Sequence, residues 1–163
     1  MVQVPEEKVH ESISEEPIQV QTTRFGTINV NKKRIIEFPE GILGFPKQKR
    51  FTILEHKPDS PFCWLQSLED PALAFVLTSP FLVLPDYLKG LGGPYEEILE
   101  GVGKGETALF VLVTIPPGRV EDMTANLLGP IVIDIASRKG RQIVLANSPY
   151  SPRHPLTEML GGW

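Results

Sequence analysis

The sequence has little of the chemistry that builds covalent, metal or thiol sites: it contains one cysteine and three histidines. A lone cysteine excludes an internal disulfide framework and is typical of a reducing compartment. Cys63 lies in PFCWLQSL, between aromatic side chains, which favours a buried, inert thiol over a nucleophile. His10, His56 and His154 are widely separated and form no HxxxH or HxH pair. We therefore expect no metal site.

Long hydrophobic runs and an excess of positive charge are also lacking. The most apolar stretches, LFVLVTI and IVIDIA, have the length of a strand, whereas a membrane-spanning helix needs roughly 18 apolar residues. The acidic start, MVQVPEEKVHESISEEP, has no apolar core of a secretory signal. The formal net charge of −4 disfavours direct binding to nucleic acid or to an anionic membrane, because both attract positive surfaces. We expect a cytoplasmic protein that binds neither.

No catalytic motif is recognisable. Residues 101–108, GVGKGETA, superficially resemble a phosphate-binding loop, but glycine follows the lysine and no long helix is predicted to follow. Glu69 and Asp70 precede Pro71, where a turn with Asp accepting backbone hydrogen bonds is favoured over a catalytic carboxylate pair. No serine lies in a GxSxG motif. We expect no catalytic residues, no enzymatic activity and no cofactor.

Glycine and proline are abundant, with 14 and 16 residues, so turns must be frequent. Between them lie short runs rich in Val, Ile, Thr and Phe, a pattern typical of strands. The predicted strands are 22–26, 27–31, 34–38, 51–55, 62–68, 74–78, 107–115, 123–127, 131–136 and 141–146, the last two forming a hairpin. Only residues 87–90 and 95–100 indicate helix. The fold class is therefore predicted to be all-β, a small, partly open, barrel-like domain with little helix.

Acidic residues are concentrated at the start of the chain. Residues 1–20 contain five glutamates and one lysine, which accounts for the whole net charge, and too few large apolar side chains to order themselves. We predict a flexible acidic arm at 1–20, the β-barrel-like domain at 21–157 and a short C-terminal tail at 158–163. The free protein is expected to be a monomer.

A series of motifs runs through almost the whole domain in a fixed order. They are TTRFGTINV, IIEFPEGILGFP, FTILEH, SPFCWLQSLEDPALAFVLTSPFLVLPDY, TALFVLVTIPPG and TANLLGPIVIDIASRKGRQIVLANSPYSPRHPL, covering about residues 22–156. This order resembles the flagellar assembly factor FliW family. The acidic arm and the GGW ending lie outside the resemblance.

The resemblance implies a barrel-like, non-enzymatic, cytoplasmic protein that binds two protein partners in exchange. One partner is flagellin, held before export, and the other is CsrA, an RNA-binding translational repressor. When export frees the FliW-like protein, it binds CsrA and allosterically lowers its affinity for the flagellin messenger. Three alternatives stay open: a flagellin chaperone without CsrA antagonism, a direct RNA binder, and a small-molecule-binding barrel, which needs a closed apolar cavity of roughly 300 Å³ or more.

The first candidate contact residues lie in the predicted C-terminal hairpin and the tail after it. Gln142 and Ile143 would belong to an exposed strand edge, and Tyr150 and His154 to the proline-punctuated segment SPYSPRHP, which together form a possible docking strip for a partner. An equally favoured alternative is that Tyr150 and His154 clamp the tail onto the barrel.

The second candidate is the bend between two predicted strands. Asn126, Pro130 and Ile131 could contact a partner there, although a side-chain hydrogen bond that fixes the bend is favoured for Asn126. The glycines and phenylalanines of FPEGILGFP, residues 38–46, are expected to be turn and core residues.

Overall fold

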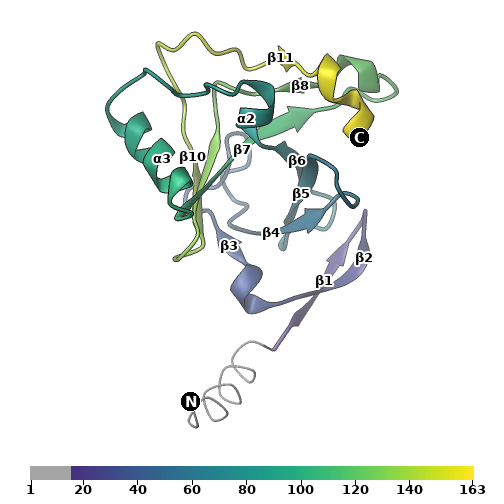
Figure 1. Ribbon diagram of the computed structural model, residues 1–163. Helices are drawn as coiled ribbons and strands as arrows, with labels where there is room; N and C mark the ends of the chain where they lie inside the picture. The colour runs from purple at the N-terminus through teal and green to yellow at the C-terminus, as the bar shows by residue number, and fades with distance from the viewer. Residues whose placement is uncertain (1–15) are drawn as a thin grey trace.

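Seven strands form a closed ring in the computed structural model, which describes residues 16–163 (Figure 1). Around the ring the order is β7 (Thr107–Thr114), β6 (Ala74–Thr78), β5 (Phe62–Ser67), β4 (Arg50–Glu55), β3 (Ile36–Glu37), β10 (Lys139–Gln142) and β9 (Ile131–Asp134), which pairs back onto β7. Only the β3–β10 pair is parallel. The prediction of an all-β, barrel-like domain with little helix is confirmed, and the barrel is closed instead of partly open.

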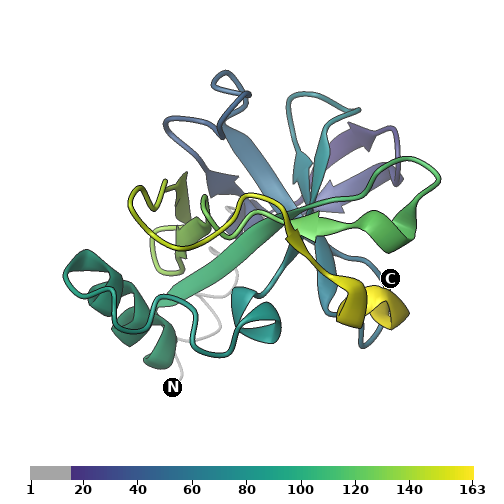
Figure 2. The same ribbon diagram turned by 90° about the horizontal axis from the view of Figure 1, so that it is seen from above.

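The other elements surround this ring. The hairpin of β1 (Ile18–Thr22) and β2 (Gly26–Val30) forms a separate sheet, and β8 (Thr124–Ala125) and β11 (His154–Pro155) extend the sheet outward from β7. The helical segments are α2 (Pro80–Val83), α3 (Pro94–Gly103) and the 3₁₀ turns η1 (Lys32–Arg34), η2 (Val120–Asp122) and η3 (Thr157–Gly162). Figure 2 shows α3 and η3 on opposite flanks of the molecule.

Several predicted boundaries are wrong. The expected strand at 22–26 is a turn, in which Thr22 Oγ1 donates to Gly26 O and accepts from Phe25 N. The strand before it, β1, begins at Ile18, inside the range assigned to the flexible arm, while residues 1–15 of that arm lie outside the described residues. Helix is found at 94–103, as expected for 95–100, but residues 87–90 form turns.

The C-terminal residues 158–163 pack against the barrel. Trp163 stacks on His56 with ring centroids 4.2 Å apart, and its main-chain oxygen lies 2.9 Å from His56 Nε2. Trp64 Nε1 donates to His56 Nδ1 at 3.2 Å, so the imidazole links the tail to β5.

Two apolar clusters occupy the two faces of the sheet. The barrel interior is filled by alternate residues of the ring strands, among them Phe51, Leu65 and Ile131. On β10, a Cβ at Gly140 would lie 2.6 Å from the ring of Phe38, so only glycine fits there. The outer cluster lies beneath α2, α3 and the C-terminal segment, and Val111 of β7 belongs to it.

The two ends of the barrel differ. At the end where β4 begins and β10 finishes, the segment 38–49 folds over the opening and the Phe45 ring packs edge-on against Phe75, with centroids 5.1 Å apart. We call this the capped end. The opposite end carries η1 and the turn 135–138, and a hollow of about 460 Å³ opens there. We call it the open end.

Candidate docking surface

The segment GILGFP forms a tight turn on the capped end. Gly41 N donates to Phe38 O at 2.9 Å, and Phe45 N donates to Ile42 O at 2.6 Å. Gly41 has φ +72°, and a Cβ there would lie 2.6 Å from Phe45 O, so only glycine is compatible with this turn. Ile42 is buried, whereas Leu43 is 63% exposed and Phe45 39% exposed. The local geometry thus presents two large apolar side chains to solvent.

Gln142 braces this turn against the barrel. Its Oε1 accepts a hydrogen bond from Leu43 N at 2.9 Å, and its Nε2 donates to Gly129 O at 2.9 Å. On one side β10 is paired with β9 from Lys139 to Gln142, and on the other side it pairs with β3 at Lys139. The contacts of Gln142 with the turn and with Gly129 are made by its side chain.

The bend at 126–131 is fixed by hydrogen bonds to the side chain of its own Asn126. Asn126 Oδ1 accepts from Leu128 N and Gly129 N, each at 3.0 Å, which is the bend-fixing hydrogen bond favoured for this residue. Pro130 is buried and Ile131 lies in the barrel interior with no exposed surface. Neither Pro130 nor Ile131 presents its side chain to a partner in this structure.

Tyr150 and His154 attach the tail to the barrel. Tyr150 Oη accepts a hydrogen bond from Leu88 N at 2.7 Å, and its ring lies 4.7 Å from that of Tyr87. Burial, and then the nearby Tyr150, raise the pKa of Tyr87, whose hydroxyl donates to Leu127 O. His154 belongs to β11, where it pairs with Ala125 of β8. The clamp alternative matches this geometry.

Exposed apolar side chains lie on the two chain segments that the Gln142 side chain joins. Ile143 is half-buried against the outer cluster, and Leu145 is fully buried, so the residue between them, Val144, points outward and is 53% exposed. A groove of about 330 Å³ lies beside Gln142, between Glu40 and Pro46. We define the docking surface by its apolar anchors and its brace: Leu43, Phe45, Val144 and Gln142.

Sequence reasoning missed the anchors, although a signal was present. GILGFP places Leu43 and Phe45 on either side of Gly44, in a turn too short to bury both side chains. The strand alternation around Val144 likewise required an outward apolar residue once Ile143 and Leu145 were assigned to the core.

Comparison with known proteins identifies the family. A family model described as FliW protein matches residues 19–156. A Magnetococcus marinus protein named flagellar assembly factor FliW is 40% identical over 139 residues, covering 85% of each chain. A protein of the same name from Moorella thermoacetica is 38% identical over 139 residues, covering 85% of this chain and 88% of that protein. The chain belongs to the FliW family of flagellar assembly factors.

A solved FliW structure supports the same conclusion at the level of the fold. The crystal structure of a flagellar assembly factor FliW superposes with a TM-score of 0.70 at 38% sequence identity, covering 85% of this chain and 96% of that one. The barrel described above is therefore the fold of a FliW family member.

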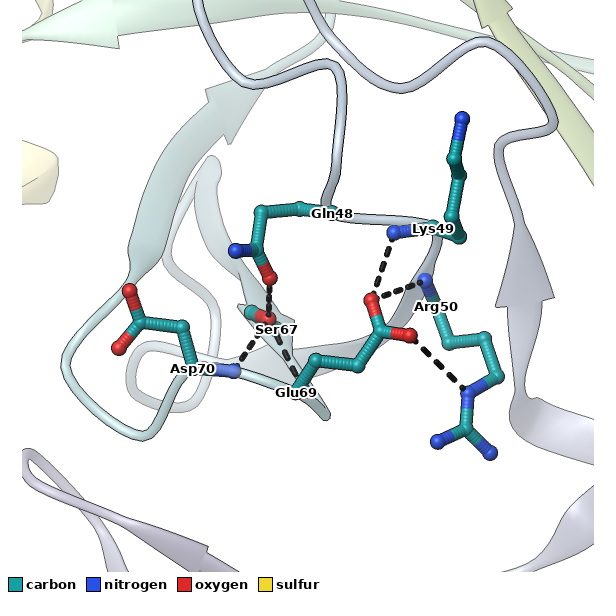
Figure 3. Close-up of polar contacts among 6 residues, drawn as sticks. All are labelled: Gln48, Lys49, Arg50, Ser67, Glu69 and Asp70. Carbon is teal, nitrogen blue, oxygen red and sulfur yellow. Dashed lines mark hydrogen bonds and ion pairs between the residues drawn. The ribbon is translucent and has the colours of Figure 1, made fainter.

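The polar network beside the capped end is the other place where chemistry could be sought in this FliW domain (Figure 3). Ser67 is fully buried; its Oγ donates to Gln48 Oε1 at 2.9 Å and accepts from Glu69 N and Asp70 N at 3.1 and 2.9 Å. All of these bonds hold the turn that follows β5. The serine is therefore bonded as a turn residue and has no base beside it in the network.

The two carboxylates of this turn are likewise used by the backbone. Glu69 Oε1 accepts from Lys49 N at 2.7 Å, and its Oε2 lies 3.6 Å from Arg50 Nε (Figure 3). Asp70 Oδ1 accepts from Ala72 N at 3.0 Å, as expected for a turn before proline. The pair joins two loops and shows no arrangement for acid and base chemistry.

The described part of the chain offers no cluster of metal ligands and no ionised thiol. Within residues 16–163, no group of three or more His, Cys, Asp or Glu side chains could hold a metal ion, and no helix is long and apolar enough to cross a membrane. Burial raises the pKa of the Cys63 thiol to about 11, which keeps it protonated. The 460 Å³ hollow is an open cleft, not the closed cavity that a small-molecule barrel requires.

Proposed function

We propose that the chain binds flagellin in the cytoplasm and, once released, binds CsrA and allosterically antagonises its RNA binding, without enzymatic activity. Membership of the FliW family supports a role in flagellar assembly. The observation that carries the proposal is the docking surface, where Leu43, Phe45 and Val144 are exposed on the two segments that the hydrogen-bonded Gln142 joins.

This surface has the anatomy of a protein interface. Interfaces take most of their affinity from a few large anchors, surrounded by polar groups that exclude water. The turn that carries Leu43 and Phe45 is fixed by Gly41 and by the Gln142 brace, so little conformational entropy is lost when a partner binds. A rigid apolar patch of this kind favours a protein partner over a small ligand.

Isothermal titration of the full chain with the CsrA of the same organism tests the proposal, followed by the same titration with flagellin already bound. We expect stoichiometric binding that is lost when flagellin occupies the protein. Because allosteric coupling is reciprocal, RNA bound to CsrA should weaken its binding to this chain by the same factor by which the chain weakens RNA binding.

A matched pair of variants assigns the surface. Leu43→Asp places a charge on an apolar anchor. It should weaken the binding of CsrA about tenfold or more, because hot-spot anchors contribute about 1.4 kcal/mol or more each. Leu82→Asp changes a leucine of similar exposure, 59% against 63%, on α2 and should leave binding unchanged. Equal weakening by both variants would remove the docking surface from the proposal.

The remaining arms separate the alternatives. Binding of flagellin with no heat from CsrA would indicate a dedicated flagellin chaperone. A salt-dependent gel shift of the flagellin messenger by this chain alone would indicate a direct RNA binder.

A further inference from the structure

The open end of the barrel is an apolar cleft that nothing in the proposed function uses. Its floor is made of residues that belong to the barrel interior: Ile53 of β4, Ala108 and Phe110 of β7, and Ile133 of β9. All but Ile133 are only partly buried, and Ile135, just beyond β9, is 49% exposed. The capped end has a loop over the same interior, whereas here the described residues leave the floor facing solvent.

The rim of this cleft is positively charged. Lys33 and Arg34 of η1 lie on one side, and Arg138 of the β9–β10 turn lies on the other. Among the ion pairs formed within residues 16–163, none involves Arg34 or Arg138. The nearby Asp134 carboxylate accepts a hydrogen bond from Ser137 N at 2.8 Å. An aliphatic floor with a cationic rim fits a segment that carries aliphatic side chains next to carboxylates.

The chain itself contains such a segment, immediately before β1. Residues 2–15 carry four glutamates against one lysine, together with three valines and one isoleucine. Ile18, the first residue of β1, pairs with Val30, and η1 begins at Lys32, so β1 begins beside the cationic rim. Fourteen extended residues span at most roughly 50 Å, which is ample to cross a barrel mouth.

We propose that the open end of the barrel binds the chain's own acidic segment, residues 2–15, with aliphatic side chains on the floor and glutamates beside Lys33, Arg34 and Arg138. Charge complementarity, the composition of the segment and the point where β1 begins all favour this occupant over a partner's segment. The acidic segment then shields an apolar surface, and an acidic partner segment could reach the cleft only by displacing it. This inference does not rest on the proposed function.

Paramagnetic relaxation in the full-length chain tests the proposal. A Ser12→Cys substitution provides a thiol for a nitroxide label. The native Cys63 thiol is largely buried and protonated at neutral pH, so the label attaches at position 12. We expect the label to broaden the NMR signals of the Ile53, Ile133 and Ile135 methyl groups. The methyl groups of Leu43, at the opposite, capped end of the barrel, should be broadened much less.

Matched charge variants show whether the rim holds the segment. Arg34→Gln combined with Arg138→Asn removes two rim charges, and asparagine tolerates the positive φ of 57° at position 138. This double variant, or an increase in salt, should reduce the broadening severalfold. The control double variant Arg119→Gln, Arg153→Gln changes two exposed arginines outside the cleft and should leave the broadening unchanged.

Each other outcome overturns the proposal. Sharp methyl signals at the open end in the labelled chain would mean that the segment does not bind there. Broadening seen only when a spin-labelled chain is mixed with a separate isotope-labelled chain would mean that the occupant comes from a second copy. Equal loss of broadening in both double variants would mean that the rim charges play no specific part.

Discussion

The two ends of the barrel share one ring of strands but differ in what covers them. At the capped end, the Phe45 ring packs on the Phe75 ring, and the centroid of the Phe75 ring lies 6.1 Å from that of Phe51. At the open end, η1 and the short turn 135–138 line the hollow, and Ile135 beside it is 49% exposed. The strands therefore determine the barrel, whereas the connections determine whether the interior is covered at each end.

This difference predicts where stability is concentrated. Edge-on aromatic pairs and a braced turn contribute packing and hydrogen bonds at the capped end. The open end keeps partly buried aliphatic side chains that contribute less. Substitutions should therefore cost more at the capped end than at matched positions of the open end.

The largest effect is expected from Gly41→Ala. The new Cβ would collide with backbone atoms of Phe45 and Pro46 at 2.6 and 2.7 Å, and φ is +72°. We expect a loss of about 3 kcal/mol of unfolding free energy, measured by urea denaturation. Gly44→Ala is the matched control: φ is +88°, but nothing lies within 4 Å, so it should cost only about 1 kcal/mol. Equal costs would contradict the tight turn.

A second pair compares exposed apolar side chains at the two ends. Phe45→Ala removes the contact with Phe75 and should cost about 1–2 kcal/mol. Ile135→Ala, at the open end and similarly exposed, should cost under about 0.5 kcal/mol. Thermal unfolding of both variants measures the difference, and a larger cost for Ile135→Ala would reverse the comparison.

A smaller effect is expected from Cys63, a partly buried residue of the barrel interior. Burial raises the pKa of its thiol from 9.0 to about 11, so the unfolded chain ionises first as pH rises. Its contribution to stability is complete below pH 9 and is lost between pH 9 and about 11. Cys63→Ala should make the unfolding free energy, measured by urea denaturation at a series of pH values, less dependent on pH in that range. An unchanged slope in the variant would show that the thiol does not titrate there.

The smallest effect concerns Asp134, which is exposed beside the open end. Hydrogen bonds from the side chain and backbone of Ser137 hold the pKa of Asp134 below its ordinary value of 3.8. The unfolded carboxylate therefore protonates first as pH falls, and the contribution to stability, present above pH 3.8, is lost below it. Ser137→Ala should weaken this acid dependence slightly, measured by thermal unfolding at several acidic pH values. A steeper acid dependence in the variant would contradict this assignment.

Much of the fold could be predicted from the sequence because strand and turn signals are local. The predicted strand 74–78 coincides with β6, and 51–55 differs from β4 by a single residue. Errors fall where local pattern is weak. The expected strand 22–26 is a turn because the Thr22 hydroxyl accepts a hydrogen bond from Phe25 N and donates one to the main-chain oxygen of Gly26, where β2 begins. Barrel closure depends on the pairing of β7 with β9, which no local signal specifies.

The candidate site was only partly predictable. Gln142 is central to the docking surface, but its hydrogen-bond partners could not be predicted from local pattern. Leu43 is 99 residues away in the sequence, and Gly129 lies 13 residues away, before β9. Tyr150 and His154 fit the clamp alternative because Leu88 and β8 lie where the tail crosses the barrel. Whether any of these residues contacts CsrA or flagellin stays a prediction.

The sequence by itself determined the family, the strand-rich character and the acidic segment, because motif order, alternation and composition are properties of the chain alone. The tertiary structure alone decided that the barrel closes, that Leu43 and Val144 face outward, and that the cleft at the open end has a cationic rim. The physical reason is that exposure and charge clustering depend on which distant segments meet, and those contacts form only when the ring is complete.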